Sequence, residues 1–165
     1  MDGTSIRQRR REDAKTRKKL YDTYLANAKY VNNWDLVDSS ARAIVGAQLF
    51  DSNGGTKTLD KLAKSKDLWE RRIATIATSY FIAREEYAPT LRISKTLLLD
   101  DHDLVHKAVG WMLREVGNRN RGVEERFLVE HQRIMPRTML RYAIEKFPEA
   151  LRKQYLNGTA KVPKN

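Results

Sequence analysis

An aromatic ring and a carboxylate lie one helical turn apart in the stretch 32–40. Asn32 or Asn33 can cap a helix that begins here, because a short side-chain amide oxygen accepts the unpaired N–H groups of a first turn. Trp34 and Asp38 then fall on one face of that helix, four residues apart. A carboxylate supplies negative charge and an indole face attracts cations, so these two side chains together can stabilise positive charge.

The core does not need either side chain. The apolar residues that continue at helical spacing and can form the buried face are Leu36, Ala41, Ile44, Val45 and Leu49. The alternative interpretation is that Trp34 packs against the protein and that Asp38 is a solvated acid favoured by the dipole of the first turn. Spacing alone favours this simpler interpretation.

Two other stretches are weaker candidates for a metal site and a nucleotide-binding site. His102 and His106 are four residues apart, but no glutamate stands beside His102 as it does in a zinc-protease helix. The stretch 51–55 has the composition of a turn and ends in a glycine pair before Lys57, but it lacks the spacing of a nucleotide-binding loop. We therefore assign no metal and no cofactor.

The composition points to an all-α protein with a polyanionic partner. The 165 residues carry a formal net charge of +11, which favours nucleic acid first and an acidic membrane surface second. Leu, Ala, Arg, Lys and Glu dominate, and no sustained β-branched alternation occurs. The chain has no cysteine, no apolar run as long as a membrane span and no apolar segment of a secretory signal near its start.

The predicted helices are organised as a weak repeat. They cover residues 33–49, 56–65, 91–99, 103–117, 122–133 and 136–147, with further helices from Ala14, from Asp67 and ending near Leu156. Asp35, Asp67, Asp103 and Pro136 begin helices at intervals of 32 to 36 residues, which is typical of an α-solenoid built from stacked helix pairs. An irregular helical bundle would share most of these local signals.

The chain divides into three parts. Residues 1–13 form a basic flexible N-terminus, residues 14–156 the helical-repeat domain and residues 157–165 a polar tail that we expect to fray. The basic residues between positions 7 and 19 fit equally well a solvated segment and an arm that contacts phosphates.

Four motifs connect the repeat to a known family. They are Asn-Trp-Asp-Leu-Val-Asp at 33–38, Trp-Glu-Arg-Arg-Ile-Ala at 69–74, His-Lys-Ala-Val-Gly-Trp-Met-Leu-Arg-Glu at 106–115 and Arg-Tyr-Ala-Ile at 141–144. In this order and spacing, the chain resembles the AlkD-type DNA alkylation repair family of HEAT-like-repeat glycosylases over roughly residues 30–156.

The resemblance implies an all-α fold of HEAT-like repeats stacked into an α-α superhelix, whose basic concave face wraps double-stranded DNA. It implies excision of cationic alkylpurines, 3-methyladenine and 7-methylguanine among them. Asp38 matches the catalytic carboxylate, Trp34 and Trp111 match the aromatic residues that flank the damaged nucleotide, and Arg72 matches the groove arginine. The residues expected to contact the DNA backbone are Lys107, Arg114, Arg137, Arg141 and Arg71, with Arg72 also positioning phosphates. We expect a cytoplasmic monomer that associates with the nucleoid when it acts on DNA.

The chemistry of such a site is coherent. A purine alkylated at N3 or N7 is already a cationic leaving group, so the reaction needs no strong general acid, and the chain offers no obvious acid/base pair. The reaction does need a carboxylate such as Asp38 to stabilise an oxocarbenium sugar and orient water, as in glycoside hydrolysis. The alternatives are a DNA-binding protein without enzymatic activity and a helical-repeat scaffold for protein interactions.

Overall fold

The computed structural model describes residues 3–52 and 56–161. Every regular element within these ranges is helical, which confirms the all-α prediction. Residues 53–55 of the predicted turn, with its glycine pair, lie outside the described residues. None of the helices in the described ranges combines the length and the apolar character needed to cross a membrane.

The elements follow one another with short connections. The first part of the chain contains α1 (Gly3–Ala26), the 3₁₀ turn η1 (Ala28–Tyr30), α2 (Trp34–Ala41), the π-helical turn η2 (Arg42–Gly46), α3 (Ala47–Asp51) and α4 (Lys57–Ala63). The remainder contains α5 (Leu68–Ala77), α6 (Ser79–Ile82), α7 (Ala88–Thr96), α8 (Asp103–Gly117), α9 (Arg121–His131), α10 (Arg137–Ala143) and α11 (Glu149–Leu156).

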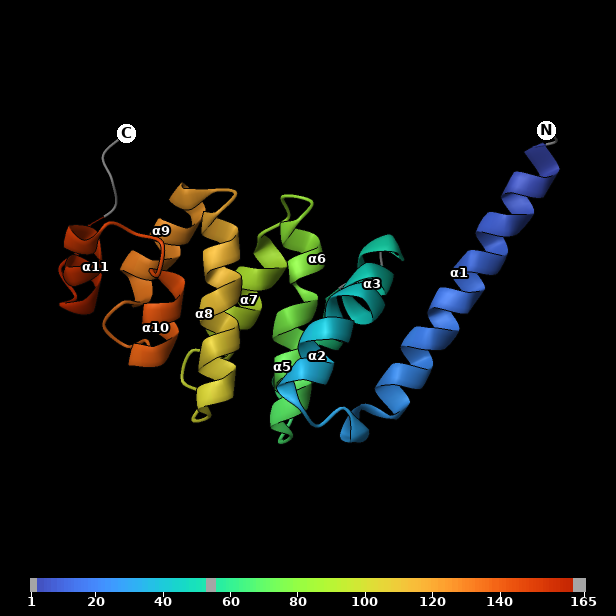
Figure 1. The fold of residues 1–165 in the computed structure, drawn as a ribbon, viewed down its shortest axis with the longest axis horizontal. Helices are drawn as coiled ribbons and strands as arrows, with labels where there is room; N and C mark the ends of the chain where they lie inside the picture. Colours follow the sequence, from blue (N-terminus) through green and yellow to red (C-terminus); the bar gives the residue numbers. More distant parts are fainter. Residues whose placement is uncertain (1–2, 53–55, 162–165) are drawn as a thin grey trace.

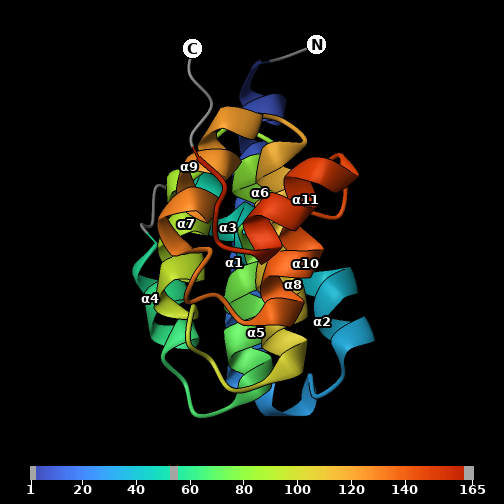
Figure 2. The same ribbon diagram turned by 90° about the vertical axis from the view of Figure 1, so that its left-hand side faces the viewer.

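The helices stack in two layers. Helices α4, α7 and α9 lie on one side, and α2, α5, α8 and α10 form the other side (Figure 2). Within the second layer α2 packs on α5, α5 on α8 and α8 on α10, so that the chain advances along one direction from α2 to α11 (Figure 1). Helices α2 to α11 bury apolar residues against their neighbours in the stack, as expected of a solenoid. The predicted helical-repeat architecture is therefore confirmed.

Polar side chains define the starts of the layer-forming helices. Asn33 Oδ1 accepts a hydrogen bond from the amide of Asp35 at 3.0 Å, as predicted for the cap of this helix. Asp67 caps α5 from the equivalent position at 2.8 Å, and His102 Nδ1 caps α8 at 3.2 Å. The repeated aspartates are thus not equivalent, because Asp67 is itself the cap whereas Asp35 and Asp103 lie in the first turn.

The first helix begins earlier than the sequence predicted. Helix α1 starts at Gly3 and not near Ala14, so residues 3–13 are helical where a flexible N-terminus was expected. Arginine, glutamine and glutamate in this segment favour helix, and no proline interrupts it. The helix extends away from the body of the solenoid (Figure 1). It is held by its C-terminal part, where Tyr24 Oη lies 2.9 Å from Ser40 Oγ of α2.

The start of the C-terminal tail is packed, contrary to the predicted fraying. Ala160 is buried, and its carbonyl accepts a hydrogen bond from Gln132 Nε2 at 2.9 Å. Gly158 adopts a left-handed conformation with φ of 68°, which turns the chain back over the end of α9. Residues 162–165 lie outside the described residues.

The helix that carries Trp34 and Asp38 contains a π turn. The apolar stripe of α2, η2 and α3 consists of the buried residues Val37, Ala41, Val45 and Leu49, each four positions from the next, with Gly46 and Ala47 also buried beside it. Leu36 was predicted in the core but is 49% exposed. A spacing of four drifts around a regular α-helix, and the wider π turn returns the later residues to the buried face. Val37 therefore heads the apolar stripe in place of Leu36.

Two glycines allow close approach between neighbouring helices. A Cβ atom on Gly46 would overlap the carbonyl oxygen of Ala77 at the end of α5. A Cβ atom on Gly110 of α8 would overlap the carbonyl oxygen of Met139 on α10. These positions set how near α2–α3 lies to α5 and how near α8 lies to α10.

We expect Gly110→Ala to destabilise the protein by about 1–3 kcal/mol, because the added methyl group forces α8 and α10 apart. Gly122→Ala is the matched control, since a Cβ at Gly122 meets only side-chain atoms at 3.5 Å or more. The control is expected to be neutral or slightly stabilising, as alanine favours helix. Urea unfolding measures both, and equal stabilities of the two variants would contradict the close-approach interpretation.

A buried acid lies where α8 meets α9. Glu124 is 1% exposed, and its carboxyl group packs directly against the backbone of Gly117. Burial raises the pKa of Glu124 to about 8, although the nearby Arg121 opposes this. Among the described residues no group donates a hydrogen bond to its Oε1 atom, which suits a neutral acid.

This pKa predicts that stability depends on pH. Between the ordinary pKa of 4.5 and the folded value of about 8, the folded chain binds more protons than the unfolded chain. The free energy of unfolding should therefore fall as pH rises through this window and then level off. Glu124→Gln should remove most of this slope and be more stable than the parent at pH 8.5, by at least about 2 kcal/mol.

Glu125→Gln is the control for this experiment, because Glu125 is ion-paired with Arg121 at 3.0 Å. It should lose stability across the pH range and keep most of the slope. The measurement is the free energy of unfolding of the parent and both variants at several pH values. A Glu124→Gln variant with the parent's pH dependence would show that Glu124 is charged in the folded protein.

Candidate functional site

Side chains of the second layer surround a cavity of about 330 Å³, named here the Trp34 cavity. It is lined by Trp34, Asp38, Arg72, Leu104, Lys107, Trp111, Arg114 and Tyr142. These residues come from α2, α5, α8 and α10, the helices stacked side by side in that layer. The structure thus brings together the predicted catalytic residues, although they are far apart in the sequence.

Asp38 and Arg72 form a two-point ion pair at one wall of this cavity. Arg72 Nε donates to Asp38 Oδ1 at 2.9 Å, and a terminal nitrogen donates to Oδ2 at 2.7 Å. The other terminal nitrogen donates to the carbonyl oxygen of Leu104. The pair fixes the plane of the carboxylate, whose side chain is 18% exposed, and each oxygen keeps a further lone pair.

The position of Arg72 differs from the expectation that it would position phosphates. The residue is 5% exposed, and each of its guanidinium nitrogens already donates to Asp38 or Leu104. A phosphate could reach this group only by breaking the pair. The geometry assigns Arg72 to holding Asp38, because a buried guanidinium needs a full set of partners.

Two indole rings border the cavity from different helices. Trp34 of α2 is 54% exposed, so this ring does not serve the core. Trp111 of α8 is half-buried, and its Nε1 donates to Glu115 Oε1 at 3.2 Å, which orients the ring. Helix α5 packs against both α2 and α8, and its Arg72 holds Asp38 in the same cavity as the two rings.

The cations of the Trp34 cavity are paired with acids. Lys107 Nζ lies 2.8 Å from Asp103 Oδ2, and this hydrogen bond raises the pKa of Lys107. The same contact, followed by one with Thr138, holds the pKa of Asp103 below its usual range. Arg114 is ion-paired with Glu145, just after α10. Lys107 and Asp103 are well exposed, so this lysine can exchange its partner for a phosphate at small cost.

Three predicted DNA contacts lie outside the cavity. Arg71 donates to Asp100 at 2.6 Å and to the carbonyl oxygens of Ser65 and Lys66 in the turn before α5. Arg137 donates to the carbonyl oxygen of Leu156. Arg141 is exposed on α10 but does not line the cavity. Arg71 thus joins the turn before α5 to the turn before α8, in place of the DNA contact expected from the sequence.

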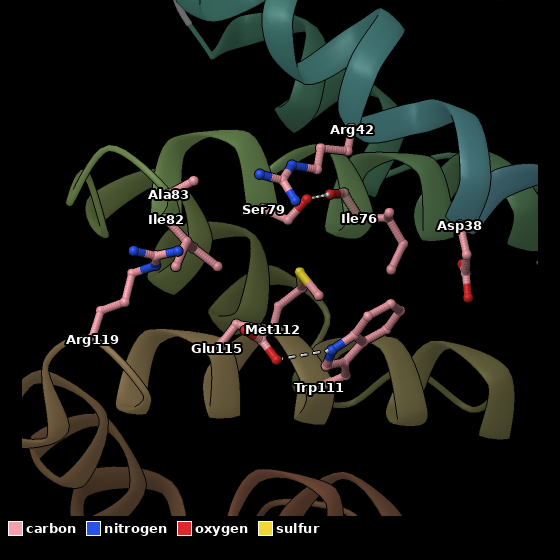
Figure 3. Close-up of a pocket in the computed structure, with 10 residues that line it drawn as sticks. All are labelled: Asp38, Arg42, Ile76, Ser79, Ile82, Ala83, Trp111, Met112, Glu115 and Arg119. Atoms are coloured by element: carbon pink, nitrogen blue, oxygen red, sulfur yellow. Dashed lines mark hydrogen bonds between the residues drawn. The ribbon is translucent and has the colours of Figure 1, made fainter.

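A second cavity of about 250 Å³, named here the Arg42 cavity, adjoins the first (Figure 3). It is lined by Asp38, Arg42, Ile76, Ser79, Ile82, Ala83, Trp111, Met112, Glu115 and Arg119. Sequence reasoning did not select Arg42, Glu115 or Arg119, nor Tyr142 of the first cavity. The helical spacing of four from Asp38 to Arg42 and from Trp111 to Glu115 could have indicated the first two.

The two histidines that lie four residues apart, His102 and His106, have structural partners. His102 Nδ1 caps α8 by accepting from the amide of Leu104. His106 Nε2 lies 2.5 Å from the carbonyl oxygen of Asp100, in the turn before the same helix. Both rings therefore contribute to the start of α8, which carries Lys107 and Trp111.

The chain belongs to the DNA alkylation repair enzyme family, whose model matches residues 4–147. The match runs from α1 through α10 and includes every residue that lines the two cavities. None of the curated proteins matches the chain. Family membership supports an enzyme that acts in DNA alkylation repair and has DNA as its partner.

The buried position of the Asp38–Arg72 pair predicts strong coupling in stability. Arg72→Met should cost about 3 kcal/mol, because it leaves a carboxylate and the Leu104 carbonyl without their donor. Asp38→Asn should also destabilise by leaving a buried guanidinium without its counter-ion. The double variant should cost less than the sum of the two, by about 2 kcal/mol.

Arg92 and Asp60 provide the matched control pair. They join α7 to α4 at 2.8 Å, but their side chains are 42% and 36% exposed. Their coupling should stay below about 1 kcal/mol. Chemical unfolding of both cycles makes the comparison, and equal coupling energies for the two pairs would mean that burial does not strengthen the Asp38–Arg72 interaction.

Proposed function

We propose that the chain is a monofunctional DNA glycosylase that excises N3- and N7-alkylated purines, such as 3-methyladenine and 7-methylguanine, from duplex DNA. One observation carries this proposal. A carboxylate, Asp38, is held in fixed orientation in an open cavity bordered by the rings of Trp34 and Trp111. This arrangement supplies negative charge and π-faces to a site where positive charge develops.

The reaction needs little else from the protein. The bond between the sugar C1′ atom and the purine nitrogen breaks, and its electron pair leaves with the cationic base, which becomes neutral. The sugar is left as an oxocarbenium ion. A water molecule adds its oxygen to C1′ and loses a proton to solvent, giving free base and an abasic site. Asp38 stabilises the oxocarbenium charge and orients the water, as carboxylates do in glycoside hydrolysis.

The pairing with Arg72 suits this role. The guanidinium group fixes the carboxylate before the substrate arrives, so no reorganisation is required as charge develops on the sugar. Lys107 and Arg114 line the same cavity and would hold phosphates beside the damaged nucleotide. Trp34 and Trp111 would lie against the sugar and the cationic base.

The competing candidate is a DNA-binding protein without enzymatic activity. Each Asp38 oxygen already accepts a hydrogen bond from Arg72, which is also what a purely structural ion pair between neighbouring repeats would show. Such a protein would bind duplex DNA through the same cations and would release no base. Catalysis requires the Asp38 charge and simple binding does not, so a substitution at this residue separates the two.

We expect Asp38→Asn to lower excision of 7-methylguanine and 3-methyladenine by on the order of a hundredfold or more. Binding to undamaged duplex should change little, because a groove carboxylate repels phosphates and adds nothing to ground-state affinity. The measurement is release of free base from methylated duplex by purified protein. Uracil, a neutral lesion, should be spared by the parent chain.

Leu128→Ala controls for lost stability. Leu128 is fully buried on α9 in the other layer, and its truncation should cost about 2–5 kcal/mol without touching the cavity. This variant should keep its excision rate at temperatures where it is folded. An Asp38→Asn variant as fast as the parent would remove Asp38 from the mechanism, and a parent chain that releases no base would favour the DNA-binding protein.

A further inference from the structure

The Trp34 cavity and the Arg42 cavity meet at the proposed reacting centre. Asp38 and Trp111 line both cavities, so they stand at the boundary between them. The Trp34 cavity continues toward Tyr142 on α10, whereas the Arg42 cavity continues toward α6 and the turn after α8. An extended polymeric ligand bound at Asp38 can therefore run from one cavity into the other.

The Arg42 cavity carries two arginines from separate elements. Arg42 comes from η2 and Arg119 from the turn after α8; the Arg42 guanidinium lies by Ser79 and that of Arg119 by Ile82, both away from Asp38 (Figure 3). Both residues are exposed. Within residues 3–52 and 56–161, neither guanidinium group takes part in an ion pair, unlike Lys107 and Arg114 in the Trp34 cavity.

The remaining polar groups of the Arg42 cavity are already engaged. Ser79 Oγ donates to the carbonyl oxygen of Ile76 at 2.7 Å. Glu115 accepts from the Trp111 ring, and Asp38 is held by Arg72. The donors offered to a ligand are thus the two guanidinium groups, whose planar forks match the oxygen pairs of phosphate.

We propose that the Arg42 cavity is a phosphodiester subsite for the damaged strand. The strand would run from the Trp34 cavity, past Asp38 and Trp111, into the Arg42 cavity, where Arg42 and Arg119 hold a phosphate next to the damaged nucleotide. This inference rests on the proposed glycosylase function for the position of the lesion. The subsite itself can be tested by measuring DNA binding, without excision.

The test is the salt dependence of binding to a short duplex that contains a tetrahydrofuran abasic-site analogue. Neutralising both arginines in R42Q/R119Q should reduce the slope of log affinity against log salt by about 1 for the phosphate lost. Affinity near 100 mM salt should fall by roughly three- to tenfold. R42K/R119K keeps the charges and should retain the slope.

The matched control is R92Q/R126Q, which neutralises two exposed arginines on α7 and α9 in the other layer. It should leave the slope within error of the parent. A slope that is unchanged in R42Q/R119Q, or lowered equally in the control, overturns the subsite. Circular dichroism of each variant confirms that its helices remain folded.

A second measurement locates the phosphate. Replacing single phosphates beside the abasic analogue by uncharged methylphosphonates should weaken binding of the parent at the contacted position. The same replacement should cost R42Q/R119Q nothing further, because the interaction is already absent. Additive losses at every position would place both arginines away from the damaged strand and overturn the proposal.

Excision distinguishes a failure of this subsite from a failure of the proposed function. If the parent binds with the expected coupling but releases no base, the subsite stands and the glycosylase proposal fails. If the parent excises methylated purines while R42Q/R119Q keeps the parental slope, the glycosylase proposal stands and the subsite fails. A parent chain that does not bind the duplex overturns both.

Discussion

The contact between the buried Arg72 and Asp38 both holds neighbouring helices together and orients the carboxylate of the candidate site. Removing a guanidinium group from water is costly, and only a complete set of partners offsets that cost. Arg72 finds its partners on both neighbouring helices of its layer, at Asp38 of α2 and at the Leu104 carbonyl of α8. The carboxylate that we place in catalysis is therefore oriented by the same side chain that ties three helices together. A substitution that removes the Arg72 side chain would therefore affect both the packing of the three helices and the orientation of Asp38.

Arginine-to-acid contacts recur between other neighbours, but their surroundings differ. Arg92 of α7 reaches Asp60 of α4, and Arg114 of α8 reaches Glu145 beyond α10. Contacts between successive units are the expected source of cohesion in a solenoid, where each unit touches only its neighbours. The exposed Arg92–Asp60 pair contributes little, because water competes for both charges. Among the ion pairs of residues 3–52 and 56–161, the Arg72–Asp38 pair is the one that combines a buried guanidinium group with a place in the cavity wall.

The helices and their stacking were predictable from the sequence, whereas the partners of individual charged side chains across the stack were not. The capped helix that presents Trp34 and Asp38 follows from side-chain types and spacing, and the repeated helix starts indicated the solenoid. Arg71 and Arg72 are adjacent in the sequence, yet the first joins two turns and the second faces Asp38. Propensity and charge cannot separate such neighbours, because the packing of α5 between two other helices decides which one is buried. Arg119 reaches the Arg42 cavity from a turn without any periodic pattern, so no local signal marks it.

The two indole rings are carried by α2 and α8, and α5 is inserted between these helices. The distance between the two rings is therefore set by α5, which carries neither ring. That distance depends on how Gly46 seats against the end of α5 and on buried side chains such as Ile73, which is fully enclosed. Under the proposed function, the size of the lesion that fits would therefore depend on apolar residues that do not contact it. On the proposed function, substitutions in the core of this protein would alter its tolerance for bulky adducts while every residue that lines the cavity stays the same.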